Sequence, residues 1–193
     1  MTATDPGSQS ALERVLLALS AAAPPGPRIV GIDGPAGSGK STLAAAVAAA
    51  TGAPLVGIDD FLGWTDLDPA GATWWPRLES EVLEPFLAGR DSAYRRRDWV
   101  GDPEGISVSD AWTPLAAGPL LVLEGVSVTR AALADRLAVR VWVEAPGDVR
   151  LARGLERDGE AQRAHWLHWQ AMEQAFFAAD GTRGRADVLI TTG

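Results

Sequence analysis

Short apolar runs alternate along the chain with longer segments in which apolar residues recur at helical spacing. The short runs predict buried strands over residues 28–33, 54–58, 119–124, 139–143 and 187–191. The longer segments predict helices over residues 11–22, 40–50, 76–88, 129–137, 146–158 and 160–179. This alternation predicts an α/β fold: a three-layer sandwich in which helices cover both faces of a five-stranded, mostly parallel sheet.

The other segments lack such a pattern. Residues 1–10 are polar and predict a tail, and residues 61–74 are rich in glycine, proline and tryptophan, which predicts a loop. Residues 89–118 are polar and basic in the middle, so we expect irregular structure there. A chain of 193 residues is the length of one domain, and we treat residues 1–193 as a single domain.

Composition and charge narrow the classes of partner. The net charge of −8 repels nucleic acid and anionic membranes, so we expect neither as a partner. No apolar run approaches the ~20 residues that span a bilayer, and Met1–Ser10 lack the basic group of a secretory signal, which favours a cytoplasmic protein. The absence of cysteine excludes thiolate chemistry, and two histidines leave little for a histidine-based metal site.

A glycine-rich segment joins the first predicted strand to the next predicted helix. Residues 34–41 fit G-x-x-x-x-G-K-[ST], in which backbone N–H groups and a helix N-terminus surround a phosphate. Lys40 is the only lysine beside sixteen arginines, and it supplies a compact charge that arginine replaces poorly. The residues expected to bind ATP here are Gly34, Ala36, Gly37, Ser38, Gly39, Lys40, Ser41 and Thr42. The motif does not distinguish ATP from GTP, or a kinase from another nucleotide hydrolase.

Carboxylates follow the second and third predicted strands. Asp59 and Asp60 end the second strand and Glu124 ends the third. Because ligands of open α/β sheets lie at the carboxyl ends of the strands, we expect these groups to converge beside Lys40. Phosphoryl transfer uses one carboxylate to orient or deprotonate the attacking hydroxyl and another in the metal shell. Alternatively, the aspartates cap a turn and Glu124 faces solvent.

The ordered set of motifs resembles the uridine kinase group of P-loop kinases, which includes uridine–cytidine kinases, phosphoribulokinase and bacterial pantothenate kinase. Asp-Asp-Phe-Leu at residues 59–62 is similar to its Asp-x-Phe-Tyr motif, and residues 123–125 are similar to its Leu-Glu-Gly. Further similar segments are residues 150–153, 157–158 and 185–190. The resemblance covers about residues 28–191, whereas the glycine-rich loop alone also resembles that of cytidylate kinase.

The resemblance assigns roles on the donor side. It implies that Asp59 is the catalytic base and that Ser41 and Glu124, with Asp59 nearby, hold Mg²⁺. It also implies a lid over residues 150–163 that closes on ATP. The sequence adds that three arginines of this segment recur at i, i+3 and i+7, and so share one helix face. They are Arg150, Arg153 and Arg157. We interpret them as a clamp for phosphate charge; the alternative is a solvated face.

On the acceptor side, the resemblance places the pocket in the irregular segments after the acidic motif. Aromatic side chains there could stack on a base or cover an apolar acceptor, or could serve packing alone. Residues 94–99 resemble the Tyr-Asp-Phe element of uridine kinases, with an arginine triplet inserted that could bind an anion or remain solvated. The acceptor-side candidates are Asp60, Phe61, Trp64, Trp75, Tyr94, Arg97, Asp98 and Trp99. By contrast, we expect Trp166 and Trp169, three apart on the last helix, to pack in the core.

Three departures from the family pattern matter. Leu62 replaces the tyrosine of Asp-x-Phe-Tyr, and no histidine precedes His165. Gly154 interrupts the paired arginine of the lid, and a glycine there destabilises the helix by ~1 kcal/mol relative to alanine. The first two concern the acceptor and leave the ATP side unchanged. We predict a kinase that transfers the γ-phosphoryl of ATP, with Mg²⁺, to a hydroxyl of a small molecule, uridine or cytidine by resemblance. The alternatives are a non-nucleoside metabolite, a nucleoside monophosphate, or a switch ATPase without a small-molecule acceptor.

Overall fold

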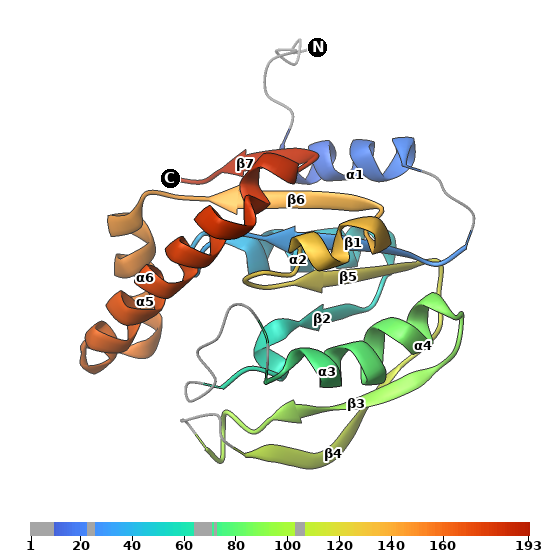
Figure 1. Ribbon diagram of the computed structural model, residues 1–193, viewed down its shortest axis with the longest axis horizontal. Coiled ribbons are helices and arrows are strands. Elements are labelled where there is room, and N and C mark those ends of the chain that lie inside the picture. Colours follow the sequence, from blue (N-terminus) through green and yellow to red (C-terminus); the bar gives the residue numbers. More distant parts are fainter. Residues whose placement is uncertain (1–9, 23–25, 64–70, 72, 103–106) are drawn as a thin grey trace, which may run out of the picture.

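A five-stranded parallel sheet forms the centre of the molecule (Figure 1). The computed structural model describes residues 10–22, 26–63, 71, 73–102 and 107–193. The strands lie in the order β2-β5-β1-β6-β7 and all neighbours pair in parallel. Their bounds are β1 Arg28–Asp33, β2 Leu55–Gly57, β5 Leu120–Glu124, β6 Val139–Glu144 and β7 Val188–Thr191. The predicted five-stranded parallel sheet is therefore confirmed.

Both faces of the sheet are buried, which explains why its strands are continuous apolar runs. In β5, Leu121 and Leu123 belong to one core cluster, and Leu120 and Val122 belong to a second cluster on the other face. The helices are α1 Ala11–Ala21, α2 Lys40–Thr51, α3 Trp75–Leu78, α4 Glu84–Leu87, α5 Gly147–Asp158 and α6 Arg163–Asp180. Apolar residues of α1 and α2 complete the second cluster, whereas α3, α4 and α6 contribute to the first. Within the described residues, no helix has the length and apolar composition needed to cross a membrane.

The helix expected over residues 76–88 is interrupted by a π-helical turn, Glu79–Leu83, between α3 and α4. Pro85 lacks the N–H that would continue the α-helical ladder, and its ring crowds the carbonyl four residues earlier, so the preceding turn widens. The helix expected over residues 129–137 is a shorter 3-10 helix, Ala131–Arg136.

The prediction of irregular structure over residues 89–118 is wrong. An antiparallel hairpin occupies this segment, with strands β3 Ser92–Arg97 and β4 Val108–Leu115. Of the six residues of β3, only Tyr94 is buried, and β4 is largely exposed, so neither strand shows the apolar alternation of a half-buried strand. The hairpin lies beyond α3 and α4, away from the central sheet (Figure 1).

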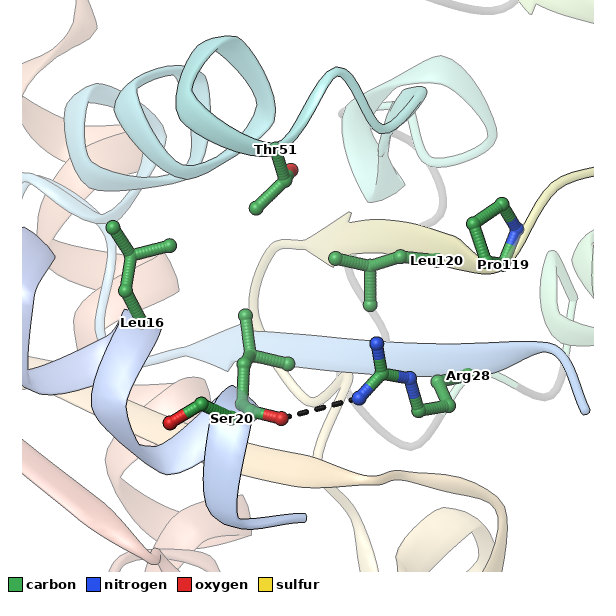
Figure 2. Close-up of a pocket in the computed structure, with 7 residues that line it drawn as sticks. Leu16, Ser20, Arg28, Thr51, Pro119 and Leu120 are labelled. Carbon is green, nitrogen blue, oxygen red and sulfur yellow. Dashed lines mark hydrogen bonds between the residues drawn. The ribbon is translucent and has the colours of Figure 1, made fainter. Parts of the chain in front are cut away.

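A shallow cavity of about 480 Å³ lies between α1, the end of α2 and the amino ends of β1 and β5 (Figure 2). The guanidinium of Arg28 donates hydrogen bonds to the carbonyl oxygens of Leu19, at 3.1 Å, and Ala22, at 2.9 Å. Cationic donors suit the carbonyl groups at a helix C-terminus, so Arg28 fastens the end of α1 to the sheet. The cavity lies at the opposite end of β1 from the glycine-rich loop.

Candidate active site

The glycine-rich loop leaves the carboxyl end of the central strand β1 and leads directly into α2. Gly34, Gly37 and Gly39 have positive φ values of 144°, 76° and 92°. A Cβ atom added to Gly34 would lie 1.9 Å from the carbonyl oxygen of Val143, and one added to Gly37 would lie 2.6 Å from that of Arg150. The loop therefore requires glycine both for its dihedral angles and for its close approach to neighbouring backbone.

Asp33, the last residue of β1, fixes the start of this loop. Its fully buried carboxylate accepts hydrogen bonds from the N–H groups of Gly34 (2.7 Å), Ser127 (2.8 Å) and Thr129 (2.8 Å). The hydroxyl of Thr129 adds a fourth bond at 3.0 Å. Burial raises the pKa of Asp33 to about 6, against the lowering effect of these bonds. The sequence does not indicate this role, because the partners of Asp33 on the segment after β5 are more than ninety residues away.

The raised pKa predicts a pH dependence of stability. The folded protein binds a proton at Asp33 near pH 6, whereas the unfolded chain does so near 3.8. Between these values the folded state holds more protons, so the contribution of Asp33 to the free energy of unfolding falls as the pH rises, by about 3 kcal/mol in total. Urea unfolding of wild type and Asp33→Asn from pH 4 to 7 measures this. The stability of wild type relative to the variant should fall over that window; a constant difference would contradict the expectation.

The predicted magnesium pair is brought together. The Ser41 hydroxyl at the start of α2 donates to Glu124 Oε2, at the end of β5, over 3.3 Å. Burial raises the pKa of Glu124, the positive charge of Lys40 lowers it, and the negative charge of Asp59 raises it. No cluster of three metal-ligating side chains occurs among the described residues. Because Mg²⁺ commonly takes one or two protein ligands and completes its shell with phosphates and water, a hydroxyl and a carboxylate beside the loop fit this ion.

The two adjacent aspartates have different surroundings. They share a 3-10 turn, Ile58–Asp60, in which Asp59 is exposed. Asp59 also lines a second cavity, which lies beside the glycine-rich loop and is here called the central cavity. Asp60 is 8% exposed and accepts hydrogen bonds from the hydroxyl of Tyr94, at 3.0 Å, and from Nε of Arg96, at 2.7 Å. Burial and the charge of Asp60 raise the pKa of Tyr94. Asp60 and Tyr94, which we expected on the acceptor side, thus anchor the hairpin to the turn that carries Asp59.

The hairpin makes two more bonds to this turn. Arg97 Nε donates to the carbonyl oxygen of Phe61 at 2.8 Å, and Trp99 Nε1 donates to that of Asp59 at 2.9 Å. The ring of Phe61 stacks on Tyr94, with centroids 5.3 Å apart. Trp99 is the member of this group that also lines the central cavity. The other contacts hold the backbone around the exposed carboxylate.

The central cavity has a volume of about 650 Å³, within the range of small-molecule sites. Its lining includes the buried Lys40, the exposed Asp59 and an apolar wall. The predicted residues that line it are Ala36, Gly37, Gly39, Lys40, Ser41, Thr42, Asp59, Arg153, Arg157 and Trp99. The apolar wall is completed by Leu62, Val126, Trp166 and Trp169. The cavity therefore extends from the glycine-rich loop to Asp59.

Other candidates lie outside this lining. Trp75 packs against the guanidinium of Arg130, whose carbon lies 4.6 Å from its ring centroid, and Asp98 Oδ1 accepts a hydrogen bond of 3.0 Å from the N–H of Gly101. Ser38 is buried within the loop, and Gly34 starts it. Trp64 lies outside the described residues. Gly34, Ser38, Trp75 and Asp98 therefore do not contribute to the wall of the cavity.

The three arginines of the predicted lid do not act as one stripe. Arg153 and Arg157 line the cavity, and Nη1 of Arg153 donates to the carbonyl oxygen of Gly37 over 3.3 Å. Arg157 pairs with Asp158 at 2.7 Å. Arg150 instead lies behind the loop and forms an ion pair of 2.6 Å with the buried carboxylate of Glu173 on α6. Two of the three arginines thus line the cavity, whereas Arg150 contacts the loop from behind.

Trp166 and Trp169 are buried, as expected, but they also line the cavity. Trp166 packs so closely on α5 that a Cβ atom added to Gly154 would lie 2.3 Å from its ring. The glycine that interrupts the arginine pair therefore makes room for an aromatic side chain of the next helix. The sequence alone could not show this, because Trp166 follows a 3-10 turn whose geometry sets the helix contact.

Gly154→Ala tests that contact. In open space the substitution would raise the free energy of unfolding by ~1 kcal/mol through helix propensity. Here the added methyl group collides with the indole, and overpacking of this kind costs about 1–3 kcal/mol, so we expect a net loss of about 1 kcal/mol. Urea unfolding measures it. Gly184→Ala is the control, because no atom lies within 4 Å of its added Cβ; equal effects of the two substitutions would contradict the packing argument.

Comparison with solved structures shows that several kinases share this architecture. No family model matches the chain. A possible uridine kinase from Bacillus stearothermophilus has a TM-score of 0.67 at 17% identity, with 93% of this chain and 96% of that chain covered. A proposed fructose transport system kinase from Silicibacter sp. TM1040 has a TM-score of 0.71 at 19% identity, over 94% of this chain and 99% of that chain. D-glycerate 3-kinase from Cryptococcus neoformans var. grubii has a TM-score of 0.65 at 13% identity, over 86% and 88%.

At these identities the likeness concerns the fold. The chain has the three-layer P-loop kinase fold that the order of its motifs predicted, along nearly its whole length. The compounds in the names of these proteins differ from one another, so the shared fold does not identify a ligand of this chain.

Proposed function

We propose that this protein is a kinase that transfers the γ-phosphoryl group of ATP to a hydroxyl group of a small molecule. One observation supports the proposal above the others. The cavity that contains Lys40 and the glycine-rich loop also contains Asp59, an exposed carboxylate held in place by its backbone carbonyl and by the turn around it. A nucleotide hydrolase can also use a carboxylate, to orient water, so the apolar wall beside Asp59 is what favours an organic acceptor.

The residues divide the reaction between them. Asp59 accepts the proton of the acceptor hydroxyl, and the oxygen of that hydroxyl forms a bond to the γ-phosphorus of ATP. At the same time the bond between the γ-phosphorus and the β–γ bridging oxygen breaks, and ADP leaves. Lys40, Arg153 and Arg157 stabilise the negative charge on the transferring group and on the departing ADP. Ser41 and Glu124 would hold Mg²⁺, which neutralises charge on the β- and γ-phosphates when bound.

The wall of the cavity favours an acceptor with a flat or apolar face. Leu62, Trp99 and Val126 line it near the proposed base, and aromatic side chains bind such faces by stacking. Uridine or cytidine fits this description and is the leading acceptor by family resemblance. A non-nucleoside metabolite with an apolar ring is the second candidate, because Leu62 replaces the family tyrosine and no histidine precedes His165.

A nucleoside monophosphate is a weaker candidate. Its phosphate would need the arginine triplet of β3, yet Arg96 pairs with Asp60, and the guanidinium of Arg95 lies over the ring of Trp112 at 5.5 Å. Because these contacts engage Arg95 within the hairpin and Arg96 at the turn after β2, they favour an acceptor without a phosphate group.

The proposal is tested by ADP release from Mg-ATP with purified protein across a panel of hydroxyl compounds. The panel contains uridine, cytidine, their monophosphates, sugars, glycerate and aromatic alcohols, and the product is identified by mass spectrometry. We expect one neutral acceptor to stimulate ADP release and to gain the mass of one phosphoryl group. The same basal rate with every compound, together with stimulation by a protein partner, would contradict the kinase and support a switch ATPase.

A further inference from the structure

A buried ion pair encloses one residue of the phosphate-binding loop. Glu173 on α6 is 1% exposed, and its Oε2 accepts a hydrogen bond of 2.8 Å from the N–H of Ala36. Its Oε1 lies 2.6 Å from Nη1 of Arg150, which also donates to the carbonyl oxygen of Ala36 at 3.2 Å. The N–H and the C=O of Ala36 are therefore both fixed, and hence the peptide planes on its two sides.

This arrangement joins three elements that are far apart in sequence. Arg150 belongs to α5, and its Nε also donates to the carbonyl oxygen of Ala145, which leads into that helix, at 3.2 Å. Glu173 belongs to α6, 137 positions from the amide that it accepts. Arg153 and Arg157 lie on α5 within about two turns of Arg150, and both line the cavity. The ion pair thus connects the loop with the helix that carries these arginines.

Stability alone is a poor explanation for such a pair. Burial raises the pKa of Glu173, and the N–H of Ala36 and the positive charges of Lys40 and Arg150 lower it. Withdrawing both charges from water is unfavourable, and well-packed apolar residues in their place are often as stable or more stable. The pair does what apolar side chains cannot do: it gives a fixed acceptor to a loop N–H and a fixed donor to a loop carbonyl.

The loop needs such support because of its composition. Ala36 is flanked by Pro35 and Gly37, and Gly34 and Gly39 lie close on either side, all three glycines having positive φ values. Glycine backbone has wide conformational freedom, so a loop of this composition loses much entropy when it is ordered around a phosphate. A protein contact that orders the loop beforehand removes part of that loss from nucleotide binding.

We infer that Glu173 is a positioning residue which, together with Arg150, holds the loop at Ala36 in the conformation that receives the phosphates of ATP and keeps α5 in register with it. The inference rests on the proposed function, because it assumes that this loop binds ATP. It also gives Arg150 a role at the loop backbone in place of the direct phosphate contact that the arginine spacing suggested.

The test separates loop positioning from stability with two variants. Glu173→Gln keeps an oxygen for the Ala36 N–H and removes the charge that faces Arg150. The double variant Arg150→Met/Glu173→Leu removes both charges, fills the space with apolar atoms and leaves the Ala36 N–H without its acceptor. Glu156→Gln, an exposed carboxylate of α5, is the matched control. Isothermal titration calorimetry with Mg-ATP gives the dissociation constant, and thermal unfolding gives Tm.

We expect the double variant to bind Mg-ATP at least tenfold more weakly than wild type while its Tm stays within a few degrees of the wild-type value. Glu173→Gln should also weaken binding, and Glu156→Gln should bind as wild type does. A double variant with wild-type affinity would overturn the inference and make the pair merely structural. Wild-type protein that does not bind Mg-ATP would instead overturn the proposed function, so the two failures are distinguishable.

Discussion

Lys40→Ala should reduce acceptor-stimulated ADP release by at least about 10³-fold, equivalent to about 4 kcal/mol of transition-state stabilisation. The side chain is 9% exposed, begins α2 and lines the cavity beside Ser41. A charge in such a partly dehydrated site acts strongly on the charge that develops during phosphoryl transfer, and alanine supplies none. The rate is measured at saturating Mg-ATP with the acceptor that the panel identifies.

Lys40→Arg refines this prediction. Arginine keeps the positive charge but presents a planar group on a different stem, which does not reproduce a compact ammonium in a narrow loop. We expect it to be nearly as slow as Lys40→Ala, with Tm close to that of wild type in both variants. Turnover of Lys40→Ala at the wild-type rate would contradict the mechanism, whatever the acceptor.

Asp59→Asn should lower kcat by about 10²–10⁴-fold and leave the affinity for Mg-ATP within about threefold of wild type. Asparagine has nearly the same shape as aspartate, but its side chain cannot take the hydroxyl proton. Because Asp59 reaches the cavity from the turn after β2, and not from the glycine-rich loop, its loss should affect the chemical step more than nucleotide binding. Single-turnover kinetics with the identified acceptor separate the two effects.

The neighbouring aspartate provides the control. Asp60→Asn makes the same chemical change one position further along, where the carboxylate pairs with Arg96 and accepts the Tyr94 hydroxyl. We expect a lower free energy of unfolding and a smaller fall in kcat than for Asp59→Asn. If Asp60→Asn lost the chemical step and Asp59→Asn kept it, the assignment of the base would have to move to Asp60.

The sheet and the loop could be predicted from the sequence because both depend on local patterns. Buried parallel strands are continuous apolar runs, and the glycines of residues 34–39 satisfy steric needs that hold wherever this loop occurs. The carboxylates at the strand ends followed from sheet geometry, and Ser41 and Glu124 indeed meet. That Asp60 anchors the hairpin could not be predicted, because its partners come from a hairpin more than thirty residues later.

The hairpin and the ion pair behind the loop show the same limit. β3 combines Tyr94 with three arginines whose charged groups find partners on other elements, so no apolar alternation marks it as a strand. Glu173 lies on the helix for which the sequence predicts burial of Trp166 and Trp169, and nothing near it in the chain indicates a contact with Ala36. Interactions between distant segments set both features, and a pattern of neighbouring residues does not contain them.

The attachment of the hairpin has a consequence for how this protein can evolve. The hairpin donates hydrogen bonds to three consecutive residues: the carbonyl of Asp59, the side chain of Asp60 and the carbonyl of Phe61. The glycine-rich loop instead follows β1, the central strand of the sheet. Natural selection can therefore exchange exposed side chains of the hairpin while Asp59 and the glycine-rich loop keep their positions.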